Sequence, residues 1–359
     1  MAHRKIDVHA HFVPPFWRTA LLENGYDHPD GTSGIPDWTI ESHLEYMNAT
    51  GTAKSILSIS SPGTDLTSDI EFTKSLTRQT NEYAADIKRQ YPNHFGFFAS
   101  LPLPDIVAAV DEIEYALDTL NADGFVLHSN TAGIYLGDPN LRPVLRALDD
   151  RNAVVFVHPT TPSSPHSCHE HDSPAERYAA SSPLAEYYTA PLFEFWFDST
   201  RSFIDLLASG TVLRFPCIRW IISHCGNTLP SLLDRLFFYN RLGAHLAEGR
   251  DPLPISEEQS REAVRQQFWF DLAGDPIPNL VDAVLKFTGK DRLMWGTDAP
   301  YTPFDVAQLE AERAECRLPA AVGDEWLDSV YWESAERLLS EQENGLGRYG
   351  RVSSNRSKL

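Results

Sequence analysis

Histidine and aspartate side chains that could bind a metal ion or move a proton stand at the ends of short apolar segments. His9 and His11 end the first such segment, and residues two apart share one face of a strand, so both imidazoles would point the same way. His158, His224 and Asp298 each end a later apolar segment. Neutral imidazole and carboxylate suit Zn²⁺ or Mn²⁺, and a catalytic ion needs only a few such ligands beside an open position. If these segments end at one place in the fold, the chain holds one divalent metal ion.

Eight short segments rich in Val, Ile and Phe recur along the chain, and each is continuously apolar, as buried parallel strands are. They are residues 5–8, 55–60, 95–101, 124–128, 154–158, 219–224, 268–272 and 293–296. Helical patterns lie between them, the clearest over residues 106–120 after the expected N-cap Asp105. This alternation predicts an α/β fold, a (β/α)₈ TIM barrel, in which the carboxyl ends of the strands gather at the active-site end. The alternative is an open doubly wound sheet, but the chain has no GxGxxG or P-loop motif to favour it.

Composition narrows the class of protein. The 359 residues suit one large α/β domain better than two small ones, and 42% hydrophobic residues supply a sizeable core. A net charge of −20 argues against nucleic acid or an acidic membrane as a partner, and no apolar stretch reaches the roughly 18 residues of a membrane helix. The first residues run straight into a strand-like segment, so we expect no signal peptide. The four cysteines, Cys168, Cys217, Cys225 and Cys316, show no pairing pattern and are expected to be reduced thiols.

Two connections are longer than a plain crossover needs. Residues 12–44, rich in Pro, Gly, Trp and Asp, are expected to form a small cap inserted after the first strand. Residues 160–183, rich in Ser, Pro and His, are expected to form an active-site loop. We therefore expect a single barrel domain over residues 1–340 and a mobile tail over residues 341–359. The final Ser357-Lys358-Leu359 matches a peroxisomal address, with the cytosol as the alternative location.

Four segments of the chain resemble the amidohydrolase superfamily, specifically its branch of α-amino-β-carboxymuconate-semialdehyde and salicylate-type decarboxylases. The matching segments are Asp7–His11, Phe156–Pro159, Ser223–Gly226 and Arg292–Pro300, in agreeing order and spacing over most of the chain. The resemblance implies that His9, His11, His158 and Asp298 hold the metal. It also implies that His224 is the catalytic histidine, close to the metal without necessarily binding it. Zn²⁺ is the first expectation for the ion, with Mn²⁺ or Mg²⁺ as alternatives.

The resemblance further implies a non-oxidative decarboxylase that acts on a small aromatic carboxylic acid, a 2-hydroxybenzoate. Likeness over the whole chain favours 6-methylsalicylate, converted to 3-methylphenol and CO₂ in polyketide secondary metabolism. Decarboxylation needs a proton at the ring carbon that loses CO₂, and Asp298 is the expected acid, with His224 holding its proton or orienting the substrate. Because a carboxylate beside a metal prefers to be ionised, Asp298 would have to gain a proton as substrate or water binds.

Two other functions stay open. A mononuclear hydrolase of lactonase type would use His224 and Asp298 to activate water, and ring opening without CO₂ would reveal it. A binding protein on a decayed barrel is the third hypothesis, which the complete set of metal-type residues disfavours. Binuclear members of the superfamily use a carboxylated lysine after the fourth strand, and residues 124–130 contain no lysine, which favours one metal. His128 in that segment could support a second ion but is expected to make supporting hydrogen bonds.

An aromatic substrate needs an apolar slot and a contact for its negative charge. Tyr301 is the favoured slot residue, because it follows Asp298 where the related enzymes carry an aromatic. Other aromatic candidates, expected mainly in the core, are Phe12, Trp17, Phe193, Phe195 and Trp196. Arg201 and Arg235 are the expected anion contacts, although each suits a surface ion pair equally well. By resemblance, an arginine near Arg235 or Arg241 reaches a neighbouring subunit's site, which implies a homodimer.

Two further groups of residues are expected to carry no chemistry. His166, Cys168, His169 and His171 lie close together without the paired spacing of a structural zinc module. Cys225 follows His224 directly, and neighbours on a strand point to opposite faces, so the two cannot easily act as a nucleophile and its base.

Overall fold

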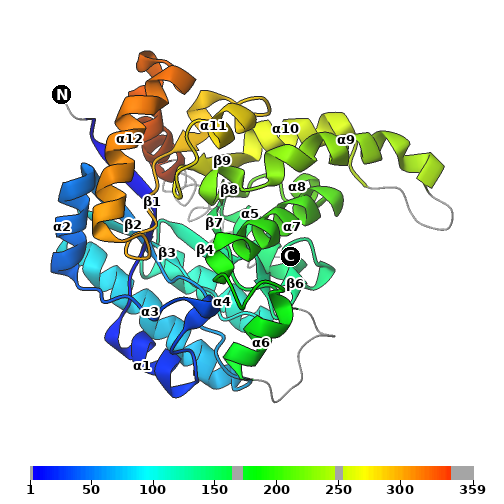
Figure 1. Ribbon diagram of the computed structural model, residues 1–359. Helices are drawn as coiled ribbons and strands as arrows, with labels where there is room; N and C mark the ends of the chain where they lie inside the picture. Colours follow the sequence, from blue (N-terminus) through cyan, green and yellow to red (C-terminus); the bar gives the residue numbers. More distant parts are fainter. Residues whose placement is uncertain (1–2, 164–172, 247–253, 341–359) are drawn as a thin grey trace, which may run out of the picture.

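The computed structural model describes residues 3–163, 173–246 and 254–340, and a barrel of eight parallel strands forms its centre (Figure 1). The strands follow one another around the barrel in the order β1-β2-β3-β4-β7-β8-β9-β10. Their bounds are Lys5–His11, Thr52–Ser58, Phe95–Ala99, Gly124–His128, Val154–His158, Arg219–Ile222, Phe268–Asp271 and Leu293–Met294. A separate antiparallel pair is formed by β5 (Asn130–Thr131) and β6 (Ile134–Tyr135). The predicted TIM barrel is therefore confirmed, and every predicted strand forms with small shifts at its ends.

The barrel closes between its first and last strands without a continuous ladder. The backbone N of Val8 donates to the carbonyl of Trp295 at 3.1 Å, and the backbone N of His11 donates to the carbonyl of Ala299 at 2.6 Å. Ala10 and Ala299 form one isolated parallel bridge. The closure therefore depends on β1 and on the segment around and after β10, which carry three of the four predicted metal ligands, His9, His11 and Asp298.

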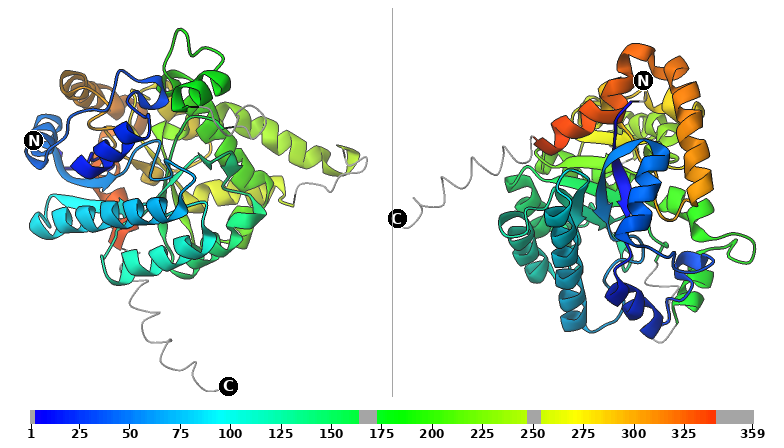
Figure 2. Two further views of the ribbon diagram at one scale, coloured as in Figure 1. Left: turned by 90° about the horizontal axis from the view of Figure 1, so that it is seen from below. Right: turned by 90° about the vertical axis from the view of Figure 1, so that its left-hand side faces the viewer.

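Helices cover the outside of the barrel and connect its strands. They are α1 (Pro15–Glu23), α2 (Ile40–Thr50), α3 (Ile70–Gln90), α4 (Ile106–Asp118), α5 (Arg142–Asp150), α6 (Pro174–Ser181), α7 (Glu194–Ala208), α8 (Thr211–Arg214), α9 (Leu229–Leu246), α10 (Glu257–Gln267), α11 (Asn279–Val284) and α12 (Phe304–Val322). The carboxylate of Asp105 accepts hydrogen bonds from the backbone N of Val107 and Ala108, so Asp105 is the N-cap of α4, as predicted. The far end of α9 extends away from the barrel (Figures 1 and 2). In the described part of the chain, no helix is both long enough and apolar enough to span a bilayer.

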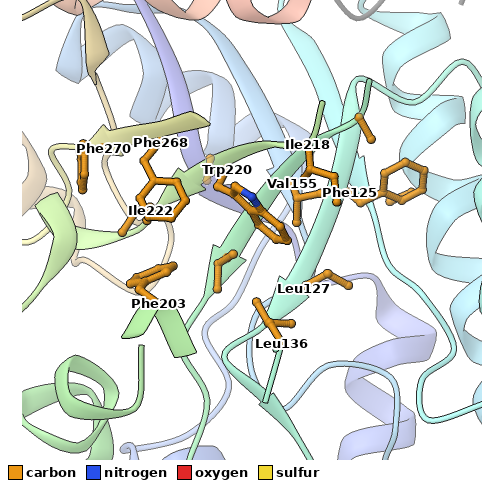
Figure 3. Packing of buried hydrophobic residues seen from close by; sticks show 14 of the residues in the cluster. Phe125, Leu127, Leu136, Val155, Phe203, Ile218, Trp220, Ile222, Phe268 and Phe270 are labelled. Atoms are coloured by element: carbon orange, nitrogen blue, oxygen red, sulfur yellow. The ribbon is translucent and has the colours of Figure 1, made fainter. Parts of the chain in front are cut away.

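Residues of the strands pack into two apolar layers. One buried cluster takes side chains from all eight barrel strands and so fills the inside of the barrel: Ile6, Val8, Ile56, Phe98, Val126, Val154, Phe156, Ile221, Trp269 and Met294. Their neighbours along the strands, such as Phe125, Val155, Trp220 and Phe268, pack outward against the helices (Figure 3). The strands are thus buried on both faces, which explains their continuously apolar sequences.

The strand β1 contains a β-bulge between Asp7 and Ala10, where β1 advances by three residues while β2 advances by two. The bulge changes which positions face inward. Val8 belongs to the inner apolar cluster, and yet His9, its immediate neighbour, also contacts an aromatic ring of that cluster. His9 and His11 are both completely buried. The bulge therefore lets one strand seal the core of the barrel and present two imidazoles above it.

The long connections contain regular structure. Residues 12–44 hold α1, a short 3₁₀ turn, and the start of α2. Residues 160–183 contain α6, which the sequence pattern did not indicate. The histidine- and cysteine-containing cluster within 164–172, the tail over 341–359 and the C-terminal tripeptide lie outside the described residues.

The packing of α7 on the barrel gives a test of the core. Phe203 of α7 is fully buried, and its ring centroid lies 6.3 Å from that of Phe268 on β9 (Figure 3). The substitution Phe203→Ala leaves a cavity, so we expect the free energy of unfolding to fall by about 3–5 kcal/mol in denaturant titrations followed by circular dichroism. Phe304→Ala is the matched control, because the side chain of Phe304 is half exposed at the start of α12, and it should cost less than about 1 kcal/mol. Equal losses in the two variants would contradict this packing.

Candidate functional site

Three imidazoles and one carboxylate meet at the carboxyl ends of the barrel strands. His9 and His11 come from β1, His158 from the end of β7, and Asp298 from the turn after β10. One ligand atom of each residue lies within 4.8 Å of the ligand atoms of the other three. The three histidines are buried, and the side chain of Asp298 is 22% exposed, so the cluster is reached past Asp298. The structure brings together the four residues that the sequence analysis named as metal ligands.

Each histidine of the cluster is oriented through its other ring nitrogen. Nδ1 of His9 lies 3.0 Å from Oδ2 of Asp271, and Nδ1 of His158 lies 2.7 Å from the carbonyl oxygen of Pro159. Nδ1 of His11 lies 3.3 Å from the carbonyl oxygen of Ser58. A metal-binding histidine almost always donates its second N–H to such an acceptor, which leaves Nε2 free to bind the ion.

The Nε2 atoms of His9 and His11 are buried and find no hydrogen-bond partner among the residues that the structure describes. They lie 3.4 Å and 3.1 Å from Oδ1 of Asp298, but not in line for a hydrogen bond. A buried polar atom without a partner costs about 1–3 kcal/mol, so folded proteins rarely leave two in one place. A divalent cation would satisfy both nitrogens and the carboxylate at once, so the residues present fit a metal ion.

Charge at the cluster also suits a cation. Burial would lower the pKa of His9, but the carboxylates of Asp271 and Asp298 outweigh it and raise that pKa to about 10. Burial lowers the pKa of His11 and holds that of His158 well below its usual range. Burial would raise the pKa of Asp298, but His9 foremost keeps it well below its usual range. An arriving cation would displace one proton from His9 and meet a carboxylate that is already ionised.

His224 stands beside the cluster in a strained backbone conformation. Its Nε2 lies 3.5 Å from Oδ2 of Asp298, and its ring centroid lies 4.8 Å from that of His9. The φ angles of His224 and Asp298 are +51° and +61°, in the left-handed region that costs a non-glycine residue about 1–3 kcal/mol. Such strain persists only where neighbouring groups hold the backbone, and it is typical of functional sites.

Two buried aspartates next to the site were not among the site residues that the sequence analysis predicted. Asp271 ends β9, inside a segment that was predicted as a strand, so the rule that selected the strand-end histidines would also have found it. Asp7 accepts hydrogen bonds from the backbone N of His9 at 3.0 Å and from Oγ1 of Thr297 at 2.5 Å. Burial raises the pKa of Asp7 to about 7. Asp7 thereby ties β1 to the segment that leads to Asp298.

Of the predicted substrate contacts, the structure brings Tyr301 to the cluster. The ring centroid of Tyr301 lies 5.5 Å from that of His11, and its buried hydroxyl has no hydrogen-bond partner within the described residues. Burial raises the pKa of this hydroxyl, so it stays protonated. Tyr301 therefore supplies an aromatic face and a donor beside the predicted metal position.

The structure does not bring Arg201 or Arg235 to the cluster within this chain. Arg201 of α7 is half exposed and lies 3.1 Å from Oδ1 of the buried Asp198. It also donates to the hydroxyl of Tyr135 at 2.9 Å. Arg235 of α9 lies beside Tyr239, with Nη2 3.4 Å from the hydroxyl.

The remaining candidates from the sequence analysis lie in ion pairs, in the buried core or next to the cluster. Arg241 pairs with Glu257 at 2.6 Å, and Cys225 is fully buried, which raises the pKa of its thiol. Burial lowers the pKa of His128 to about 4, and its ring centroid lies 6.0 Å from that of His158. Of the aromatic candidates, Phe12, Trp17 and Phe195 are buried as expected, whereas Phe193 is 39% exposed.

A cavity of about 820 Å³ adjoins the site without containing any of the four clustered residues. Its walls include Tyr26, His28 and Asp30 from the segment predicted as a cap, and Arg177 from α6. His128 lines the cavity and also lies next to His158, so it separates this cavity from the cluster. The segment predicted as a cap therefore lines a cavity that lies behind His128, next to the cluster.

Comparison with known proteins places the chain among enzymes of one kind. A family model described as amidohydrolase matches residues 6–340. Decarboxylase yanB of Aspergillus niger is 36% identical over 83% of this chain and 78% of its own length. The 6-methylsalicylic acid decarboxylase of Penicillium expansum is 35% identical over 84% of this chain and 86% of its own. The crystal structure of 5-carboxyvanillate decarboxylase from Novosphingobium aromaticivorans, with manganese and a nitrobenzoic acid, has the same fold, with a TM-score of 0.79 and 20% identity over 94% of this chain and 96% of that one.

The charge state of His9 predicts how metal binding depends on pH. With a pKa of about 10, His9 carries a proton at pH 7 that the metal has to displace. Metal affinity should therefore rise by up to about tenfold for each unit of pH between 7 and 10. Chelator competition at a series of pH values measures this slope, and His9→Gln should abolish it along with most of the affinity. A wild-type affinity that does not change between pH 7 and 9 would contradict the assigned charge state.

Proposed function

The chain belongs to the amidohydrolase family, and on that premise we propose that it is a metal-dependent decarboxylase of a 2-hydroxybenzoate. The observation that supports this most is the cluster of three imidazoles and Asp298 with His224 on its open side. The most specific form of the proposal is that the chain converts 6-methylsalicylate to 3-methylphenol and CO₂. It is supported by the relatives that share about a third of their residues with this chain over most of its length.

We propose Zn²⁺ as the resident ion, because three imidazoles and one carboxylate are ligands that Zn²⁺ commonly takes in proteins. Mn²⁺ is the alternative, since the carboxyvanillate decarboxylase of the same fold was crystallised with manganese. When bound, the ion supplies the positive charge that attracts the carboxylate and phenol oxygens of the substrate to an otherwise acidic protein.

In the proposed reaction, His224 and Asp298 move the proton. Asp298 is ionised at rest, and Nε2 of His224 lies 3.5 Å from Oδ2 of Asp298, so His224 is the proposed source of the proton. Asp298 presents this proton to the ring carbon that bears the carboxylate. As the new C–H bond forms, the bond to the carboxylate breaks, its electron pair restores the aromatic ring, and CO₂ leaves. A proton from water then returns to His224.

Tyr301 would hold the aromatic ring of the substrate, with its protonated hydroxyl as a hydrogen-bond donor to the anion. Residues 12–44 would act as the cap, since they line the cavity beside the site. Arg201 and Arg235 have partners away from the cluster in this chain, so a contact between Arg235 and substrate would require a second subunit.

The direct test incubates the zinc-loaded protein with 6-methylsalicylate and measures CO₂ and 3-methylphenol. We expect one of each per substrate consumed, loss of activity on chelation, and restoration by Zn²⁺. His224→Ala should lower kcat by about 10²–10⁴-fold, because it removes the proton donor. His94→Ala is the matched control, since His94 is exposed before β3, and it should keep full activity.

Other outcomes of this assay distinguish the alternatives. Ring opening of a lactone without release of CO₂ would replace the decarboxylase with a mononuclear hydrolase. Full metal content without turnover of 6-methylsalicylate or any other hydroxybenzoate would remove the proposed reaction. Equal activity with Mn²⁺ and none with Zn²⁺ would correct the assignment of the ion.

We also propose that the protein is a homodimer. Large apolar side chains are exposed close together along the chain before and within α7: Leu184, Tyr187, Tyr188, Leu192, Phe193 and Phe197. Phe238 and Tyr239 are exposed on α9, which packs against α7. An exposed apolar surface of this kind is typical of a protein contact, and the nearby Arg235 would lie at the same face.

This assembly can be tested in solution. Sedimentation should show a dimer for the wild-type protein and a monomer for Phe197→Glu, because the substitution places a charge in the apolar contact. Leu309→Glu, which introduces the same charge at an equally exposed position on α12, should remain dimeric. A monomeric wild-type protein would exclude the dimer.

A further inference from the structure

Asp271 lies between the metal cluster and His224, at the end of β9. Its side chain is completely buried, and so is the side chain of His9, which it contacts. A buried carboxylate needs a hydrogen-bond donor for each of its oxygen atoms. The donors that Asp271 has identify its role.

One oxygen of Asp271 sets the orientation of His9. Oδ2 lies 3.0 Å from Nδ1 of His9, and a carboxylate oxygen can only accept, so Nδ1 must carry the hydrogen. The other nitrogen of the ring, Nε2, is then the one that can give up its hydrogen and offer a lone pair to the cluster. In this way Asp271 selects the one tautomer of His9 that can bind a metal.

The other oxygen of Asp271 holds the backbone that carries His224. Oδ1 accepts hydrogen bonds from the backbone N of His224 and the backbone N of Ala273, both at 3.0 Å. His224 has a φ of +51°, and Cys225 after it also has a φ of +51°. Hydrogen bonds to a charged acceptor are about twice as strong as neutral ones, so this contact stabilises a turn that the chain would otherwise avoid.

The segment after β10 packs closely on both Asp271 and His9. A Cβ atom at Gly296 would lie 2.9 Å from Cβ of His9 and 3.1 Å from Cβ of Asp271. Glycine at this position therefore lets the backbone after β10 pack directly onto the pair. The pair is held from the sides as well as by its own hydrogen bond.

We propose that Asp271 is a positioning residue that couples the metal to His224: one oxygen orients the ligand His9, and the other fixes the turn that presents His224. The inference rests on the metal site of the proposed function, but not on the identity of the substrate. It predicts that the two roles of Asp271 can be separated by substitution.

The two variants to compare are Asp271→Asn and Asp271→Ala. In Asp271→Asn, the amide oxygen can still accept from the backbone N of His224, but the amide NH₂ faces Nδ1 of His9 and cannot accept from it. Zinc affinity in chelator competition should fall about 10–100-fold, while the turn stays in place. In Asp271→Ala, both contacts are lost, so zinc affinity should fall and the turn should loosen.

The stability of the turn is measured without substrate, from the rate of amide hydrogen exchange in the peptide that contains His224. We expect exchange near the wild-type rate in Asp271→Asn and at least tenfold faster exchange in Asp271→Ala. At saturating zinc, kcat should likewise recover in Asp271→Asn and stay depressed in Asp271→Ala. The matched control is Asp123→Asn, another buried aspartate, which accepts from the backbone N of Phe97 at 2.9 Å and from Nζ of Lys88 at 2.8 Å. It should leave zinc affinity and exchange at His224 unchanged.

Two results would overturn the inference. Zinc affinity of Asp271→Asn within twofold of wild type would remove the role toward His9. Unchanged exchange at His224 in Asp271→Ala would remove the role toward the turn. The wild-type protein could bind zinc and differ from the two variants in these ways, yet fail to decarboxylate 6-methylsalicylate. In that case the inference about Asp271 would stand, and the proposed substrate would be wrong.

Discussion

The barrel mouth depends on two imidazole nitrogens, Nε2 of His9 and Nε2 of His11, that are buried and form no hydrogen bond within the described part of the chain. Each such atom costs the folded state about 1–3 kcal/mol, and the fold places both beside an ionised carboxylate. The surroundings maintain this arrangement from every direction. The inner apolar cluster excludes water from below, and acceptors at Asp271, Ser58 and Pro159 fix the rings from behind. As far as residues 3–163, 173–246 and 254–340 show, the cluster is open on the side of Asp298, where His224 and Tyr301 lie.

Much of the fold and of the metal cluster could be predicted from the sequence, because each strand and the site residue at its end are neighbours in the chain. A continuously apolar segment followed by histidine or aspartate predicts a buried parallel strand with a functional end. The predicted bounds of the strands at 124–128 and 154–158 are those observed. Residues two apart on a strand share a face, and His9 and His11 do lie together. The family motifs then indicated which strand ends belong to one site.

The other features of the site depend on how strands pair and on contacts between residues far apart in the sequence, which a single sequence does not reveal. The bulge in β1 exists because β1 and β2 advance at different rates, and no pattern within β1 alone reports its partner's register. Asp271 ends a strand like the other site residues, but its value lies in contacts with His9 and with the backbone of His224, 47 residues earlier. The sequence does not show that Arg201 forms an ion pair with the buried Asp198 one turn earlier on its own helix, away from the metal cluster. Helix α6 begins with a Ser173–Glu176 capping box inside a segment whose overall composition is that of a loop.

The way the barrel closes has a consequence for the stability of the protein and for its resistance to proteolysis. The seam between β1 and the segment after β10 lacks a continuous ladder, and the same two segments provide three of the four clustered ligands. An ion bound there would cross-link the seam, adding RT ln(1 + [metal]/Kd) to the stability of the closed form. A shortage of metal would then lower the stability of the closed barrel, and proteases would remove the molecules that unfold more often. The abundance of the protein would thus follow the metal supply of its surroundings, without any dedicated regulator.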